Sequence, residues 1–345
     1  MTVTVVTDSA AALPADLVVR HGIRVVPLWL HVGDEHRRDG EMDVDDLVAR
    51  LDEPISTSAP SPGELAAAIA EARGRGEVLV LTVGAGFSST HDAAVLAARL
   101  VGVPPGPSPG VAATPGAVSP GPVPRPGRAP EGDAALGPGA DAGTARAGGP
   151  GSGVTGGTAP QGEPGPDGRP TDDRGVAVVD TGTAAGAQAL VVLAAAEAAA
   201  AGDDLAAVKA VAERVAGRVR LVATVADLER LAASGRVPEA ARWVGDRLGV
   251  RPLFELRGGR VRPLRPAFSA EAAYQRIVAR CAEDAVPGGR LHLIVLHALD
   301  PAAAARLVEL TAPLAPATCV VGGFGPVMVA HTGRGLAGLA WWWDG

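Results

Sequence analysis

Short apolar runs alternate with helical segments along most of the chain. Residues 78–83 form a continuous apolar run typical of a buried strand, and residues 89–101 after them predict a helix. The same order returns at residues 176–179, a second apolar strand, which a helix over 184–201 follows. Strands alternating with helices in this order are typical of a parallel sheet covered by helices. We therefore predict an α/β fold that begins with a Rossmann-like parallel sheet.

The same two patterns extend toward both ends of the chain. The further predicted strands are residues 2–6, 24–30, 218–225, 252–256, 260–264, 291–297, 318–321 and an apolar strand ending at Trp343. The further predicted helices follow Pro14 and cover 44–51, 63–73, 204–216, 227–233, 238–248, 270–284 and 301–310. Residues 55–62 are expected to form a polar loop, and residues 331–335 part of a tail that leads to the last strand.

One long segment departs from this pattern. Residues 104–174 contain 16 Pro and 18 Gly among 71 residues, and they show no hydrophobic period. Such a segment cannot bury enough apolar surface to offset the entropy of ordering it, so we predict a disordered insert. A proline-rich docking segment is the alternative.

The elements on either side of residues 104–174 belong to the same β-α-β-α series, so the insert is expected to interrupt one domain. We predict an N-terminal α/β domain over 1–203, interrupted by 104–174, and a C-terminal α/β domain over 204–345.

Charge and cysteine content exclude several classes of protein. The net charge is −7, from 31 basic and 38 acidic residues, and no basic cluster suited to nucleic acid is present. Cys281 and Cys319 lack the spacing of a disulfide framework or a zinc site, so two buried free thiols are expected. The N-terminus does not resemble a signal peptide, and the apolar segment 189–201 is too short to cross a membrane. A cytoplasmic protein without membrane insertion is the prediction.

Two segments rich in hydroxyl groups stand where α/β proteins bind ligands. Thr57, Ser58 and Ser61 precede a helix whose first N–H groups can attract an anion, although Ser61 as a simple helix cap is the plainer interpretation. Residues 84–90 connect a buried strand to a helix and contain Ser88, Ser89 and Thr90. Neither segment matches a Walker or dinucleotide motif, so no nucleotide cofactor is expected.

Histidines offer two further possibilities. His331 and Thr332 lie between glycines and can complete a small polar pocket, although a lone histidine is more often structural. Ser88 with His91 forms a possible nucleophile pair. A loose group of possible metal ligands consists of His31, His36, Asp39 and Glu41, which lack a recognised spacing, so no metal site is predicted.

An ordered series of short motifs resembles the DegV family of bacterial fatty-acid-binding proteins. The segments that carry the resemblance are Asp8-Ser9, 38–40, 57–63 (T-S-A-P-S-P-G for the family's T-S-Q-P-S-P-G), 88–91, 179–181, 228–237, 248–253 and 331–335 (H-T-G-R-G for H-T-G-P-G). The series covers the chain except for residues 104–174, whose removal leaves 274 residues, close to the family's length.

The resemblance implies two α/β domains with one long-chain fatty acid between them. Its carboxylate would be held by Thr57, Ser58, Ser88, Ser89 and His331. The resemblance also implies possible supporting roles for Asp8, Ser9, Thr90 and Thr332. The resemblance further implies no catalysis by this chain and a separate DAK-like fatty acid kinase subunit that phosphorylates the carboxylate.

Departures from the motifs leave other hypotheses open. Arg334 replaces the Pro of H-T-G-P-G, and Phe268 stands in a segment that is usually basic and faces the kinase, which weakens the kinase prediction. One alternative is an acyl hydrolase in which His91 or His331 activates Ser88. The other is a degenerate interaction scaffold that acts through the insert.

Overall fold

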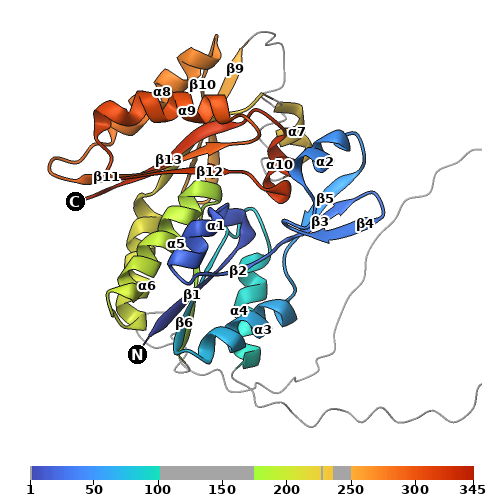
Figure 1. Cartoon of the computed structure of the whole chain (residues 1–345), viewed down its shortest axis with the longest axis vertical. Helices are drawn as coiled ribbons and strands as arrows, with labels where there is room; N and C mark the ends of the chain where they lie inside the picture. The colour runs from blue at the N-terminus through green and yellow to red at the C-terminus, as the bar shows by residue number, and fades with distance from the viewer. Residues whose placement is uncertain (1, 102–174, 227, 236–249) are drawn as a thin grey trace, which may run out of the picture. The chain divides into compact units, whose positions relative to one another are not determined.

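The four strands of a parallel sheet form the first part of the fold. A computed structural model of the chain describes residues 2–101, 175–226, 228–235 and 250–345 (Figure 1). The predicted insert 104–174 and the predicted helix 238–248 lie outside them. The sheet has the order β2-β1-β6-β7, with β1 Val3–Asp8, β2 Arg24–Val26, β6 Glu77–Thr82 and β7 Val176–Asp180. All its neighbours pair in parallel, as the β-α-β-α pattern predicts.

Helices cover both faces of this sheet. Helices α3 Pro62–Arg73 and α4 Thr90–Val101 enclose one face, where Val6, Val78 and Val80 are buried against them. Helices α5 Ala185–Ala200 and α6 Leu205–Arg218 cover the other face. The short helix α1 Ala15–Arg20 follows the 3-10 turn η1 Ser9–Ala11.

A mixed six-stranded sheet forms the second part. Its order is β10-β9-β8-β13-β11-β12, with β8 Arg220–Thr224, β9 Arg251–Arg257, β10 Arg260–Ala267, β11 Arg290–His297, β12 Thr318–Gly323 and β13 Ala337–Asp344. Only β11 and β12 are parallel among these described strands. Helices α8 Ala270–Glu283 and α9 Pro301–Thr311, followed by the turn η3 Ala312–Leu314, cover one face.

Helix α5 packs against both sheets. It contacts β1 of the parallel sheet and β11 and β13 of the mixed sheet, and most of its residues are buried. Its surface consists mainly of Ala, Gly and Val, which lets backbones approach closely. A Cβ at Gly186 would lie 3.0 Å from Leu296 and 3.1 Å from Ile294. The two sheets therefore share helix α5. The predicted domain boundary at 203/204 assigns α6 to the C-terminal domain, but α6 packs on β6 and β7 of the parallel sheet.

A small antiparallel sheet corrects two predictions. It has the order β4-β3-β5, with β3 Trp29–Val32, β4 Glu35–Arg38 and β5 Ile55–Ser58. The single strand predicted over 24–30 is wrong: β2 ends before Pro27, which has no N–H for the ladder, and β3 enters another sheet. The polar loop predicted over 55–62 is wrong at its start, because residues 55–58 pair with β3.

Three short helices surround this sheet. Helix α2 Val44–Ala49 begins at Asp43, whose side chain accepts from Asp45 N–H as a cap. Helix α7 Leu228–Ala233 contacts α10 Pro326–Thr332, which also packs on α2, β3 and β5. The sequence predicted no helix at α10, so His331 and Thr332 lie in a last helical turn and not in an extended tail. The expectation of two buried thiols is also wrong for Cys319, which is exposed on the edge strand β12.

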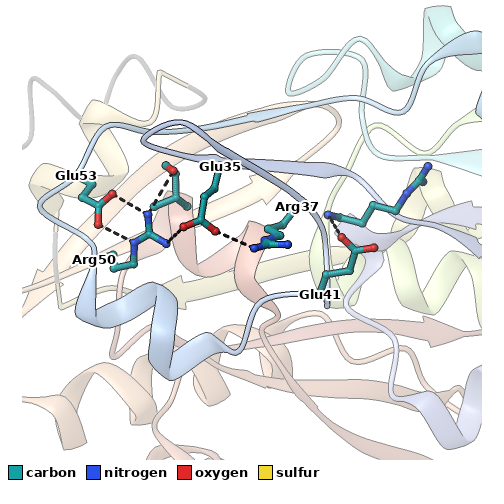
Figure 2. Close-up of polar contacts among 7 residues, drawn as sticks. Glu35, Arg37, Glu41, Arg50 and Glu53 are labelled. Carbon is teal, nitrogen blue, oxygen red and sulfur yellow. Dashed lines mark hydrogen bonds and ion pairs between the residues drawn. The ribbon is translucent and has the colours of Figure 1, made fainter.

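Charged side chains fix the segment that leads into β5 (Figure 2). Arg50 donates to Glu53 at 2.6 and 2.9 Å, and to Glu35 of β4 at 3.0 Å. Arg50 also donates to the Val32 carbonyl at 3.4 Å, and Arg37 donates to Glu35 at 3.1 Å. These contacts join the end of α2 to both strands of the β3–β4 hairpin.

Candidate functional site

An apolar cavity of about 400 Å³ lies among the three sheets. Its volume is in the range of about 300–1,000 Å³ that small-molecule sites occupy. Residues from both halves of the chain form its walls, including Leu28, Val83, Phe254, Leu256, Leu296 and Val327. The motifs of the sequence gave no indication of the wall residues from β8, β9 and α7, because these are ordinary core residues in the linear pattern.

Six polar residues belong to the cavity wall. They are Thr57, Ser58, Ser88, Ser89, His331 and Thr332, which include the five residues predicted to hold a carboxylate. Thr57 Oγ1 lies 2.9 Å from His331 Nε2, although 274 positions separate the two residues in the chain. Helix α10 makes this contact possible by packing on β5.

Thr57 and Ser58 present their side chains to opposite faces of the small sheet. Successive strand residues alternate in direction, and Thr57 lies on the face that α10 covers. Ser58 Oγ lies 2.9 Å from Nε2 of His31, on the other face. His31 Nδ1 is in turn 2.5 Å from Nδ1 of His36. Burial, and to a smaller extent the neighbouring His36, lower the pKa of His31.

The loop before α4 supplies the other hydroxyl groups. Ser88 Oγ lies 2.8 Å from Thr90 Oγ1 and accepts from Thr90 N–H at 3.3 Å. Gly84 is required here by the chain's own backbone, because a Cβ would lie 2.9 Å from the Gly182 carbonyl carbon. The loop is thus closed on itself and on the segment after β7.

The predicted supporting residue Asp8 lies beneath this loop and does not line the cavity. Its buried carboxylate accepts from Val83 N–H at 2.7 Å, Ala10 N–H at 3.1 Å and Gln188 Nε2 at 3.2 Å. Burial raises the pKa of Asp8 to about 6, against the lowering effect of these donors. Asp8 therefore holds the backbone at Val83, just before the loop that carries the Ser88, Ser89 and Thr90 hydroxyl groups.

Ser9 and Asp39 connect α10 to the N-terminal segment. Asp39 accepts from Val327 N–H at 3.1 Å, in the first turn of α10. The Ser9 hydroxyl accepts from Leu28 N–H at 3.1 Å and hydrogen-bonds Asp39. Burial raises the pKa of Asp39, with Ser9 and Val327 opposing the shift. The helix that carries His331 is thus bonded to the first forty residues of the chain.

The geometry bears on the group of possible metal ligands and on the possible Ser88 nucleophile, both raised by the sequence. Glu41 accepts from Arg38 N–H at 2.8 Å, so Asp39 and Glu41 do not converge with the two histidines on a common point. No group of three or more His, Cys, Asp or Glu with metal-binding geometry occurs in the described residues. His91 Nδ1 lies 3.3 Å from Thr82, and within the described part of the chain Ser88 has no histidine partner for nucleophilic activation.

A second, polar recess of about 620 Å³ adjoins the cavity. It shares Thr57, Ser234 and His331 with the cavity wall and is otherwise lined by residues such as Glu53, Glu229 and Arg230. Arg230 donates to the carbonyls of Leu51 and Ala330, which join α7 to α2 and α10. Thr57 and His331 therefore stand between an apolar space and a polar one.

No helix among the described residues is long and apolar enough to span a bilayer.

Curated relatives extend over almost the whole chain. A DegV domain-containing protein of Streptomyces coelicolor is 31% identical over 345 residues, 98% of this chain and 97% of the relative. Another from Mycobacterium tuberculosis is 28% identical over 348 residues, with 98% and 96% coverage.

Solved structures share the fold. A DegV family protein of Thermus thermophilus, described as fatty acid binding, matches with a TM-score of 0.73 and 26% identity over 99% of this chain and 100% of its own. DegV of Bacillus subtilis, at 22% identity and a TM-score of 0.70 over 100% of both chains, supports the fold alone. The α/β prediction is confirmed. Since a sequence model of "uncharacterised protein, DegV family" matches residues 2–115 and 157–343, the chain belongs to the DegV family.

Proposed function

We propose that the protein binds one long-chain fatty acid, with its acyl chain in the cavity and its carboxylate at Thr57, Ser58, Ser88, Ser89 and His331. The observation that carries this proposal is an apolar cavity whose wall includes several hydroxyl groups and the paired Thr57 and His331 side chains, 2.9 Å apart. The Thermus thermophilus relative, which is described as fatty acid binding, supports it.

The physical chemistry of the cavity suits such a ligand. Burying roughly a dozen methylene groups at about 0.8 kcal/mol each contributes on the order of 10 kcal/mol before ordering costs. The carboxylate would meet neutral hydroxyl donors, because no Lys or Arg lines the cavity among the described residues. Neutral donors hold the carboxylate without neutralising its charge, so it stays nucleophilic.

We further propose that the protein presents this carboxylate to a separate fatty acid kinase subunit. The polar recess shares Thr57 and His331 with the wall of the apolar cavity, which offers a path for a phosphoryl donor. Exposed Arg260, Arg262 and Arg265 on β10, with exposed Phe268 after it, provide a basic surface with an apolar end for an acidic partner.

The first experiment is to extract the purified protein with organic solvent and identify the released molecules by mass spectrometry, beside the native mass of the intact protein. A fatty acid in one-to-one amount supports the carrier function. Protein that carries no lipid and does not take up added palmitate contradicts it. Acyl phosphate formation after addition of a DAK-like kinase subunit and ATP then tests presentation separately; the chain incubated with ATP alone is the control.

A further inference from the structure

Asp39 joins three segments that form parts of the cavity wall. Its backbone N–H donates to the Leu28 carbonyl at 2.8 Å. Its carboxylate accepts from Val327 N–H at 3.1 Å, in the first turn of α10. The Ser9 hydroxyl of η1 accepts from Leu28 N–H at 3.1 Å and donates to Asp39. Leu28, Val327 and Ala10 of η1 all line the cavity, so these hydrogen bonds hold three pieces of its wall together from behind.

Helix α10 cannot cap its own beginning. Its N-cap residue is Gly325, which has no side chain to accept from the first turn, and Pro326 at the next position has no N–H. The first backbone donor that needs an acceptor is therefore Val327. Asp39 supplies that acceptor, although 288 positions separate the two residues in the chain. Because a helix of seven residues is marginal by itself, its position depends on contacts of this kind.

The close approach of Asp39 explains the glycine at position 325. A Cβ built on Gly325 would lie 3.3 Å from Oδ1 of Asp39, and its three nearest neighbours would all be atoms of that carboxylate. The backbone of Gly325 is extended, with φ −75° and ψ 177°, which any residue can adopt. The glycine therefore makes room for the carboxylate and does not serve an unusual backbone conformation.

The position of α10 decides the position of part of the proposed carboxylate site. The helix brings Val327, Met328, His331 and Thr332 to the cavity wall. His331 Nε2 lies 2.9 Å from Thr57 Oγ1. Hydrogen bonds between nitrogen and oxygen extend over about 2.7–3.2 Å, so a shift of α10 by about 1 Å would break this pair.

We propose that Asp39 is a positioning residue for ligand binding, which caps α10 from outside the helix and ties it to Ser9 and Leu28. The tie holds His331 beside Thr57, where both side chains can meet the ligand carboxylate. This inference rests on the proposed fatty acid binding. Capping and tying are separable, because a cap stabilises the helix, whereas the tie fixes where the helix lies relative to the rest of the wall.

The test compares D39A with the double variant D39A/G325S, using palmitate titration of delipidated protein and the melting temperature. D39A removes both the cap and the tie, so we expect about 10-fold weaker binding and a lower melting temperature. G325S adds a side chain that is favourable at an N-cap, in the space that the carboxylate has left. The double variant should recover the melting temperature but stay about 10-fold weaker in binding, because the new hydroxyl caps α10 without restoring the tie.

Two further variants separate the roles from the other direction. S9A keeps the cap on Val327 and removes the bonds from the Ser9 hydroxyl, so binding should weaken by about 3- to 10-fold with a small change in melting temperature. D43A is the matched control. Asp43 caps α2 by accepting from Asp45 N–H at 2.8 Å, and in the described part of the chain no residue of α2 lines the cavity. D43A should lower the melting temperature and leave palmitate affinity within about twofold.

Recovery of both affinity and melting temperature in D39A/G325S would overturn the inference, because a cap alone would then be sufficient. Unchanged affinity in S9A would also overturn it, and this result is readable even if D39A fails to fold. Both outcomes leave fatty acid binding in place. Absence of palmitate binding by the unmodified protein would instead remove the proposed function, and this inference with it.

Discussion

The two hydroxyl-bearing segments of the cavity wall are positioned in different ways. Residues 88–90 bond to each other and stand on a loop whose backbone N–H groups are held by the buried Asp8 and by Asp180. Residues 57–58 bond instead to His331 and His31, which come from other elements, and their strand begins beside the partly exposed Arg50 contacts. The first segment thus depends on a buried charge and the second on the assembly of distant parts.

The largest effect that tests this difference concerns Asp8. Its folded-state pKa is about 6 against 3.8 when exposed, so between these values the folded protein binds more protons than the unfolded chain. The free energy of unfolding should fall as pH rises through this window, by up to about 3 kcal/mol from this group. Urea unfolding of the unmodified protein and of D8N at pH 4, 5, 6 and 7 measures it.

The amide in D8N does not titrate, so the stability difference between the two proteins isolates Asp8 from all other carboxylates. This difference should shift toward D8N by about 2 kcal/mol between pH 4 and pH 7. A difference that stays constant would show that the three N–H donors around Asp8 hold its carboxylate ionised throughout.

The next effect compares the hydroxyl groups directly. T57V removes a hydrogen bond to a charged ligand while keeping the side-chain shape, which should cost about 1.5–3 kcal/mol, or roughly 10- to 150-fold in palmitate affinity. S88A should cost about 1 kcal/mol, because the Thr90 hydroxyl remains 2.8 Å from the same position.

Titration of delipidated protein with palmitate measures both, and unchanged melting temperatures show that the fold is intact. H331A combined with T57V should lose little more than T57V alone, since the two side chains act as a pair. Equal losses in T57V and S88A would remove the distinction between the two segments.

The smallest effect concerns the Arg50 contacts beside the start of strand β5, which carries Thr57 and Ser58. R50Q removes the contacts to Glu35 and Glu53, but these groups are partly exposed and screened by water. We expect a small drop in melting temperature that disappears at high salt, and palmitate affinity within about twofold of the unmodified protein. A large loss of affinity would mean that the Arg50 contacts, and not the packing of α10, place Thr57.

The same difference explains what the sequence could predict. The parallel sheet and the capped start of α3 are visible in local patterns, because apolar runs and the residues Ser61 and Glu64 act over a few positions. Strand β5 was missed because its Ser-Thr-Ser composition has no apolar alternation, and only pairing with β3 makes it a strand. Helix α10 was missed because it has only seven residues, begins at Pro326 and lies between Gly325 and Gly333, and because Asp39 and packing from distant elements support it.

The candidate site shows the same limit. The resemblance implies Thr57, Ser58, Ser88, Ser89 and His331 as site residues, and all five belong to the wall of one cavity. The pairing of Ser58 with His31 and the role of Asp8 beneath the loop depend on which face each side chain takes, and no motif encodes that.

Strand β13 lies between β8 and β11, yet it follows every other strand in chain order. During synthesis, β8 and β11 therefore leave the ribosome before the strand that joins them. Thr57 likewise has no His331 partner until α10 has been made. A nascent chain that has not reached residue 337 exposes two unpaired strand edges, which are prone to pair with other chains. The mixed sheet is thus completed only once β13 has been made, and products truncated before residue 337 should be recognised by aggregation.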